Sequence, residues 1–117
     1  MDTLVIDTAA VRNEMITAAQ QAAQKRYDEI GGDRFACGFA WVTVYPEHKG
    51  NTKQGKIERK LLESMGFRKD WTGKGYQVWD PAKWPGQSID VKSAGAVAAA
   101  KVLQKYGFKA YAGDRLD

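Results

Sequence analysis

Cysteine and histidine are almost absent from this sequence of 117 residues, and each scarcity excludes a class of site. Cys37 is the only cysteine, which excludes an internal disulfide and any metal site built from several cysteines. His48 is the only histidine, so a metal site with several histidine ligands is excluded as well. We therefore expect neither a metal nor a cofactor.

Long apolar runs and a targeting leader are also missing. No run approaches the roughly 18 apolar residues that cross a membrane, and the N-terminus lacks the basic start of a signal peptide. We expect a cytoplasmic protein that does not associate with membranes. The length and the 44% hydrophobic content suit a single domain over residues 1–117. Within it we expect an N-terminal helix in residues 1–32 and an α+β sandwich in residues 33–117.

Clusters of catalytic side chains are not recognisable either. Cys37 lies among apolar residues of an expected strand, where a thiol is buried and inert. The carboxylates stand singly at expected turns and helix starts, where they suit local hydrogen bonds. We expect no catalytic residue and a protein that is not an enzyme.

Apolar periodicity predicts three helices. The first covers residues 7–32 and ends at a pair of glycines. The second lies within residues 51–67, and the third covers residues 90–107, with Asp90 as its N-cap. The apolar face of the second helix is predicted to consist of Ile57, Leu61 and Met65.

Residues 35–45 alternate between large aromatic and small side chains. Because neither face of this strand is polar, we expect it to be central in its sheet and covered on both sides. The sequence leaves three alternatives for what covers the aromatic face: the first helix, a partner chain or stacked bases. If that face were open, Phe39 and Trp41 would resemble the stacking platform of an RNA-recognition motif. The sequence lacks the conserved aromatic run of such motifs.

Two further strands are predicted as a hairpin. Residues 67–71 and 76–80 are rich in aromatic and apolar types, and the sequence TGKG between them favours a tight turn. A last strand is predicted over residues 108–113. The aromatic residues Tyr76 and Trp79 are expected to form cross-strand pairs in the hairpin.

A weak internal repeat predicts the order of the strands. The segments KLLESMGFRK and KVLQKYGFKA share Lys, Leu, Gly, Phe and a basic residue at an offset of 41. Gly66 and Gly107 are both placed to adopt the left-handed conformation that ends a helix. The repeat indicates a ferredoxin-like βαββαβ unit with a four-stranded, mainly antiparallel sheet after the N-terminal helix. In the competing layout, a three-stranded sheet, residues 67–71 are only a loop.

Basic residues are unevenly distributed. The chain holds 18 Lys and Arg against 14 Asp and Glu, a net charge of +4, and residues 47–75 alone hold eight basic and four acidic residues. Such a local excess attracts polyanions or acidic protein surfaces, although a solvated face has the same composition. The candidate binding residues, here called the basic segment, are Lys49, Lys53, Lys56, Arg59, Lys60, Arg68, Lys69 and Lys74.

Two motifs add ligand hypotheses. Residues 50–56, GNTKQGK, fit the pattern of a phosphate loop between a strand and a helix. Ile57 stands where Ser or Thr would hold Mg²⁺, so we expect at most simple anion binding there. Aromatic residues on a basic background stack nucleic-acid bases, which makes Trp71 and Trp84 candidate binding residues beside the basic segment.

Several segments together resemble a family of small, uncharacterised proteins of tailed bacteriophages and prophages. The resemblance rests on CGFAWV (37–42), GFRKDWTGKGYQVWDP (66–81), Gln87, VKSAGAVAAA (91–100) and YGFKAYAGDRLD (106–117). It implies a phage origin and the cytoplasm of an infected bacterium. By analogy, the protein would bind or inhibit a host protein or complex, for example a defence system.

The leading hypothesis is a non-enzymatic binding protein. Its basic segment and hairpin would engage a host protein or complex with an acidic surface. The alternative is binding of nucleic acid or of a nucleotide phosphate through the same surface. The sequence leaves the oligomeric state open, with a homodimer as one alternative.

Overall fold

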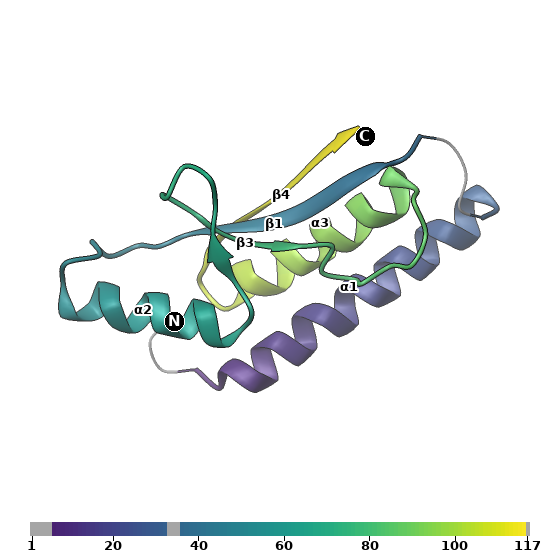
Figure 1. Cartoon of the computed structure of the whole chain (residues 1–117). Coiled ribbons are helices and arrows are strands. Elements are labelled where there is room, and N and C mark those ends of the chain that lie inside the picture. Colours follow the sequence, from purple (N-terminus) through teal and green to yellow (C-terminus); the bar gives the residue numbers. More distant parts are fainter. Residues whose placement is uncertain (1–5, 33–35, 117) are drawn as a thin grey trace.

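The computed structural model describes residues 6–32 and 36–116, which form three helices and four strands (Figure 1). The helices are α1 (Thr8–Ile30), α2 (Lys53–Ser64) and α3 (Ile89–Lys105). The strands are β1 (Gly38–Tyr45), β2 (Arg68–Lys69), β3 (Tyr76–Trp79) and β4 (Lys109–Leu116). Residue 35, the predicted start of the first strand, lies outside the described residues. Within them, no helix is both long and apolar enough to cross a bilayer.

The sheet confirms the predicted ferredoxin-like order after the N-terminal helix. Its strands hydrogen-bond in the order β2-β3-β1-β4, and all three neighbouring pairs are antiparallel. The strand β1 is central, as predicted, and pairs along its whole length with β4. The two residues of β2 pair with β3, so the competing three-stranded layout is wrong.

The two glycines of the internal repeat end their helices in the same way. Gly66 and Gly107 have φ angles of 94° and 93°, which confirms the predicted left-handed conformation. In each exit the following Phe donates its N–H to a Leu carbonyl five residues earlier, at 3.0 and 3.1 Å. Both phenylalanines are buried against the helices that they follow. The repeat therefore reflects a shared helix-ending motif.

The N-cap residues of α1 and α3 differ in how well the sequence located them. Asp7 caps α1, and its Oδ1 accepts the N–H of Ala10 at 3.1 Å. The N-cap of α3 is Ser88 and not Asp90, which lies in the first turn of that helix. The prediction erred by two residues because an acidic side chain is favourable both at the cap and in the first turn.

The helix α2 is rotated from the orientation that its apolar stripe predicted. Ile57 is 39% exposed, whereas Glu58 is buried. The carboxylate of Glu58 accepts the backbone N–H groups of Glu47 and His48 at 2.8 and 2.9 Å. The side of α2 that carries Glu58 therefore faces the protein interior, because its carboxylate binds these two loop amides. The side that carries Ile57, which the sequence predicted to face inward, is turned toward solvent.

All three helices lie on one side of the sheet (Figure 1). The small side chains of β1, Ala40, Val42 and Val44, are buried against this helical layer. The helix α1 packs on α3, where a Cβ added to Gly95 would lie only 3.2 Å from the Ala19 carbonyl oxygen. Since α1 approaches α3 this closely, it does not cross to the other side of the sheet.

The opposite face of the sheet is open. Phe39 and Tyr45 of β1 are 37% and 44% exposed, so the prediction that both faces are covered is wrong. Cys37, which was expected to be buried, is exposed just before β1. Alternation of large and small residues locates the two faces of a strand, but it does not tell whether the larger one is covered.

Candidate functional site

The open side of the sheet carries a continuous set of aromatic and cationic positions. The strand register aligns Trp41 with Trp79 on β3 and with Gly113 on β4. Residues opposite each other in antiparallel strands point to the same side. The outer face, as this surface is called below, consists of Phe39, Trp41, Thr43, Tyr45, Arg68, Gln77, Trp79, Lys109, Tyr111, Gly113 and Arg115.

Three rings at one end of the outer face form a cluster. The centroids of Trp41 and Trp79 are 4.8 Å apart with an interplanar angle of 35°, and Phe39 meets Trp79 edge-on at 5.9 Å. The Trp41 indole lies directly over β4, because a Cβ added to Gly113 would lie 2.5 Å from its Nε1. Gly113 therefore provides the space in which this indole lies against the sheet.

Cations flank this cluster. The Arg115 guanidinium carbon lies 5.6 Å from the Phe39 ring centroid and 6.0 Å from that of Trp79. The Lys92 ammonium, which donates to the carbonyl of Gly38, is 5.8 Å from the Phe39 ring. These are cation–π distances, so positive charge is held beside aromatic faces.

A second pair of rings lies further along the strands. Tyr45 and Tyr111 have centroids 6.0 Å apart. A Cβ added to Gly75 would lie 3.2 Å from the Tyr45 ring, so a glycine again makes room for an aromatic side chain. Tyr45 follows Trp41 by four residues, a span of about 13 Å along β1, which places this pair at the other end of the outer face from Trp41.

A row of hydrogen-bonded polar side chains separates the two aromatic groups. The Trp79 indole N–H donates to Gln77 Oε1 at 3.2 Å. Gln77 Nε2 in turn donates to Thr43 Oγ1, also at 3.2 Å. This chain of bonds fixes the Trp79 indole and the Gln77 amide relative to each other.

The two ends of the outer face differ in charge. Its charged strand residues are Arg68, Lys109 and Arg115, whereas the Asp70 carboxylate lies beside the Tyr45 end, because a Cβ added to Gly75 would lie 2.6 Å from Asp70 Oδ2 and 3.2 Å from the Tyr45 ring. Asp114 belongs to the other face, where its carboxylate accepts the Ser93 hydroxyl of α3 at 2.7 Å. The end that holds Phe39, Trp41 and Trp79 has Arg115 beside its rings, and exposed rings beside positive charge are chemically suited to an anionic aromatic ligand.

One half-buried carboxyl group follows Trp79 in a strained backbone conformation. Asp80 follows Trp79, has a φ of 45°, and its Oδ1 has no hydrogen-bond partner. Burial raises the pKa of the Asp80 carboxyl, while the Trp84 N–H and the Lys92 charge oppose the shift.

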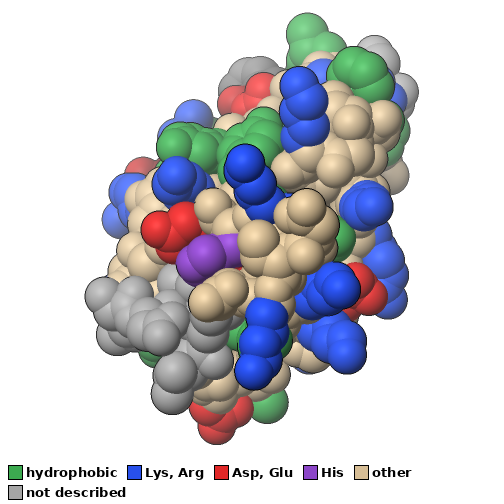
Figure 2. Space-filling model, turned by 90° about the vertical axis from the view of Figure 1, so that its left-hand side faces the viewer, with side chains coloured by type: hydrophobic (Ala, Val, Ile, Leu, Met, Phe, Trp, Pro, Cys, Tyr) green, Lys and Arg blue, Asp and Glu red, His purple; other side chains and the backbone are tan. Residues whose placement is uncertain are grey.

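The basic segment does not converge on one site. Its six lysines are exposed, and Figure 2 shows Lys and Arg spread around the end of the molecule that holds α2 and the hairpin. The side chains of its two arginines donate hydrogen bonds to backbone carbonyls of the protein itself. Arg59 donates to the carbonyls of His48 and Gly55, and Arg68 donates to two carbonyls at the end of α2.

The phosphate-loop pattern is not an open loop in the structure. Gly55 lies inside α2, and a Cβ there would lie 1.8 Å from the Lys49 carbonyl oxygen. That oxygen accepts the N–H and the hydroxyl of Thr52, whose Oγ1 also accepts the N–H of Gly55. The loop is thus closed onto the helix start by its own hydrogen bonds.

The two candidate tryptophans lie apart from each other. Trp71 is 94% exposed at the hairpin turn, where the Asp70 carboxylate accepts the N–H and the hydroxyl of Thr72. Trp84 packs on Tyr27 of α1 with ring centroids 5.3 Å apart. Tyr76 lies opposite Lys69 on β2 and Val44 on β1, which confirms its predicted place in cross-strand pairs, and its ring is buried in the core.

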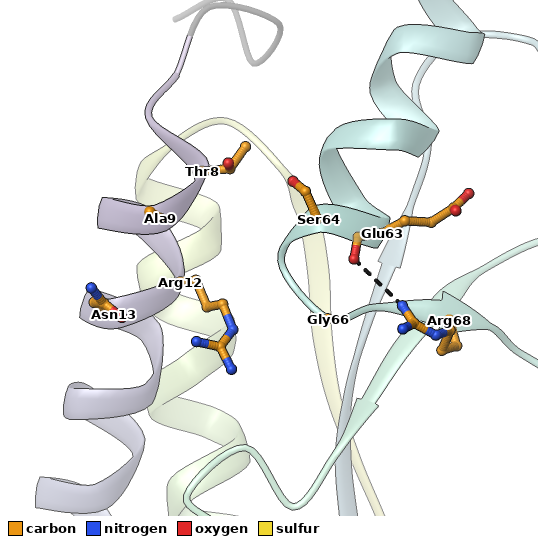
Figure 3. Close-up of a pocket in the computed structure, with 8 residues that line it drawn as sticks. All are labelled: Thr8, Ala9, Arg12, Asn13, Glu63, Ser64, Gly66 and Arg68. Atoms are coloured by element: carbon orange, nitrogen blue, oxygen red, sulfur yellow. Dashed lines mark hydrogen bonds between the residues drawn. The ribbon is translucent and has the colours of Figure 1, made fainter.

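A hollow lies between the start of α1 and the turn that follows α2 (Figure 3). Arg12 of α1 and Arg68 of β2 contribute guanidinium groups to it, whereas the Glu63 carboxylate points away from α1 (Figure 3). Arg68 donates to the Glu63 carbonyl. This hollow lies between two helices and not over the aromatic rings of the outer face.

Sequence reasoning missed Tyr45, Gln77, Lys109, Tyr111 and Arg115 of the outer face as binding residues, and it assigned Trp79 to the hairpin. The signal was present as alternation in KAYAGDRL, but only the pairing of β4 with β1 joins these positions to Phe39 and Trp41. Comparison of the chain with protein-family models, curated proteins and solved structures finds no match. The resemblance to phage proteins stays a prediction.

Proposed function

We propose that this protein binds single-stranded nucleic acid on the outer face of its sheet and catalyses no reaction. The observation that carries the proposal is the open cluster of Phe39, Trp41 and Trp79 beside Arg115. Trp79 is 49% exposed although it is large and apolar. Unpaired bases stack on exposed rings, and their phosphates are attracted by nearby cations.

Single strands suit this face better than a duplex. The rings lie against a broad sheet and not on a protruding helix, so they would reach only bases that have left a stacked pair. Because Arg115 and Lys109 supply charge at the edge strand β4, a phosphate backbone would follow that edge. Binding should weaken as salt rises, since released counterions drive part of the affinity.

The test uses labelled single-stranded oligonucleotides and fluorescence anisotropy, with DNA and RNA arms and a duplex control. Trp79→Ala should weaken binding by roughly five- to 150-fold, the range expected for one lost stacking contact. Trp71→Ala is the matched control, because it removes an exposed Trp outside the outer face. Equal affinities of the wild type and Trp79→Ala, with unchanged circular dichroism, would contradict the proposal.

Charge is tested with a second matched pair. Arg115→Gln should lower the affinity and reduce the salt slope by about one counterion. Lys101→Gln, on the exposed side of α3, should change neither. Binding that is independent of salt would refute the role of the phosphates.

A second candidate function is engagement of an acidic host protein through the hairpin, in the cytoplasm of an infected bacterium. Trp71 favours it, because exposed tryptophans are frequent anchors of protein interfaces, and Lys69 and Lys74 flank it. In a quadruple Lys→Gln variant each substitution should change stability by less than about 0.5 kcal/mol, and the variant should lose such a partner in pull-downs treated with nuclease. Its four positions are Lys53, Lys56, Lys69 and Lys74. Unchanged capture at low salt would reject this candidate.

A further inference from the structure

We propose that two copies of this protein pair through the free edge of β4, so that their sheets join into one continuous antiparallel sheet. The two edges of the sheet differ in length, because β2 has two residues and β4 has eight. A very short edge strand resists pairing with another chain, whereas a long one offers its unpaired backbone groups to it. In Figure 1, β4 (yellow) lies at the margin of the sheet, and no described element lies beyond it. The inference does not depend on what the outer face binds.

The pairing of β4 with β1 determines which backbone groups of β4 are free. The carbonyl of Ala40 accepts the N–H of the residue after β3 at 2.8 Å, so Ala40 makes no ladder bond with Asp114, which lies opposite it. Because such positions alternate with bonded ones, Ala110, Ala112 and Asp114 turn their N–H and C=O groups away from β1. Gln104 of α3 donates to the Ala110 carbonyl at 2.7 Å, which agrees with this direction. The backbone groups of Ala112 and Asp114 have no partner among the described residues.

Apolar side chains lie exposed along the same edge. The hydroxyl of Ser93 and the amide of Gln104 both bond to β4, so the side of α3 that carries them faces this strand. Val97 follows Ser93 by one helical turn and is exposed on that side. Tyr111 and Leu116 of β4 are exposed as well. Pairing at β4 would bring the second copy against these side chains and remove part of their apolar surface from water.

The edge of β4 is complementary to a second copy of itself. In a two-fold arrangement with Gly113 on the axis, Ala112 lies opposite Asp114 of the partner subunit, and the two residues exchange both backbone hydrogen bonds. The symmetry repeats this pair on the other side of the axis. On the outer face, Tyr111 lies opposite Arg115 of the partner subunit. No like charges face each other among these positions, and the glycine at the axis adds no side chain to the contact.

The neighbouring registers are less favourable. With the axis at Asp114, the two Asp114 carboxylates would lie directly opposite each other. With the axis at Ala112, Lys109 would lie opposite Arg115 of the partner subunit. Like charges that face each other across two strands are destabilising. Charge therefore favours the register centred on Gly113, in which a second copy of this chain fits the edge.

The first test measures the oligomeric state by sedimentation velocity between about 1 μM and 1 mM protein. The wild type should form dimers as its concentration rises. Ala112→Pro should raise the dimer dissociation constant at least about tenfold, because it removes an outward N–H from each copy. It leaves the bonds to β1 intact, since an edge strand tolerates proline where the N–H faces away from the sheet, and circular dichroism checks the fold. Ala112→Ser is the matched control, because it keeps the N–H at this exposed position and should dimerise like the wild type.

A second test determines the register without a proline in the strand. It uses a Cys37→Ser background, since Cys37 is exposed. Chains with Tyr111→Cys and chains with Arg115→Cys should form a mixed disulfide dimer when they are oxidised together, because Cβ atoms of opposed residues lie close enough for a disulfide. Neither variant should cross-link with itself, since its two thiols would lie about 13 Å apart along the strands.

The outcomes decide both the pairing and its register. A wild type that stays monomeric at about 1 mM would overturn the proposal, and so would dimers that persist unchanged in a folded Ala112→Pro variant. Self-cross-linking of Tyr111→Cys without the mixed product would overturn the register centred on Gly113. Dimers that Ala112→Pro weakens, that Ala112→Ser retains and that the mixed disulfide captures would support the pairing of β4 with itself.

Discussion

Replacing Gly113 by alanine should destabilise the protein by displacing the indole of Trp41. A Cβ at this position would lie 2.5 Å from Nε1, 2.6 Å from Cε2 and 2.9 Å from Cζ2 of Trp41. Because nonbonded carbon atoms pack at about 3.5 Å or more, the ring must move by about 1 Å. It has little room to move within the sheet plane, since Trp79 lies on its other side at 4.8 Å.

Two opposing free energies set the size of this effect. Overpacking of this kind costs roughly 1–3 kcal/mol, whereas alanine in place of a strand glycine gains roughly 0.5–1 kcal/mol. Gly113 is not among the glycines with positive φ, so the backbone itself accepts alanine. We expect a net loss of about 1 kcal/mol in the free energy of unfolding, measured by urea denaturation with far-ultraviolet circular dichroism.

A double-mutant cycle decides whether the steric reasoning is right. In a Trp41→Ala background the clash no longer exists, so Gly113→Ala should stabilise the protein by roughly 0.5–1 kcal/mol. The sign of its effect should therefore reverse between the two backgrounds. Gly50→Ala is the control, because a Cβ there would meet only the flexible Arg59 side chain at 3.4 Å. An equal effect of Gly113→Ala in both backgrounds would refute the assigned contact.

Three further predictions concern stability. Gly66→Ala and Gly107→Ala should each cost about 1 kcal/mol from the left-handed backbone alone, and unchanged melting temperatures would contradict this. Tyr76→Ala should cost about 3 kcal/mol in urea denaturation because its ring is buried; a loss below about 1 kcal/mol would refute that location. The raised pKa of Asp80 means that its protonated form favours folding at low pH, and this contribution is lost as pH rises through the folded-state pKa. Asp80→Asn should therefore raise the melting temperature at neutral pH more than at acidic pH, and parallel pH profiles would exclude this linkage.

Local chemistry accounts for what the sequence predicted correctly. A glycine followed by Phe after an apolar helical stripe specifies one helix ending, and its recurrence at Gly66 and Gly107 fixed the order of helices and strands. The central place of residues 38–45 followed from the lack of a polar face. These features depend on neighbours in the chain, which a single sequence contains.

The features that the sequence could not predict depend on packing between distant segments. The choice of α1 to pack on α3 depends on Gly95 and Ala19, which only the folded chain brings together. The rotation of α2 follows from the contact between Glu58 and the loop amides of residues 47 and 48. The outer face exists only because β4 pairs with β1 in one particular register.

The aromatic rings of the outer face are held in place by contacts within the sheet, although no other described element covers them. Glycines beneath Trp41 and Tyr45 let these rings lie against the sheet, while Gln77 holds the indole of Trp79. Rings that are already fixed lose little conformational freedom when a ligand covers them, so less of the stacking energy is spent on ordering. The glycine contacts and the Gln77 hydrogen bond therefore have two effects. They reduce the exposure of the rings in the free protein, and they hold the rings in the orientation that a stacked base would need.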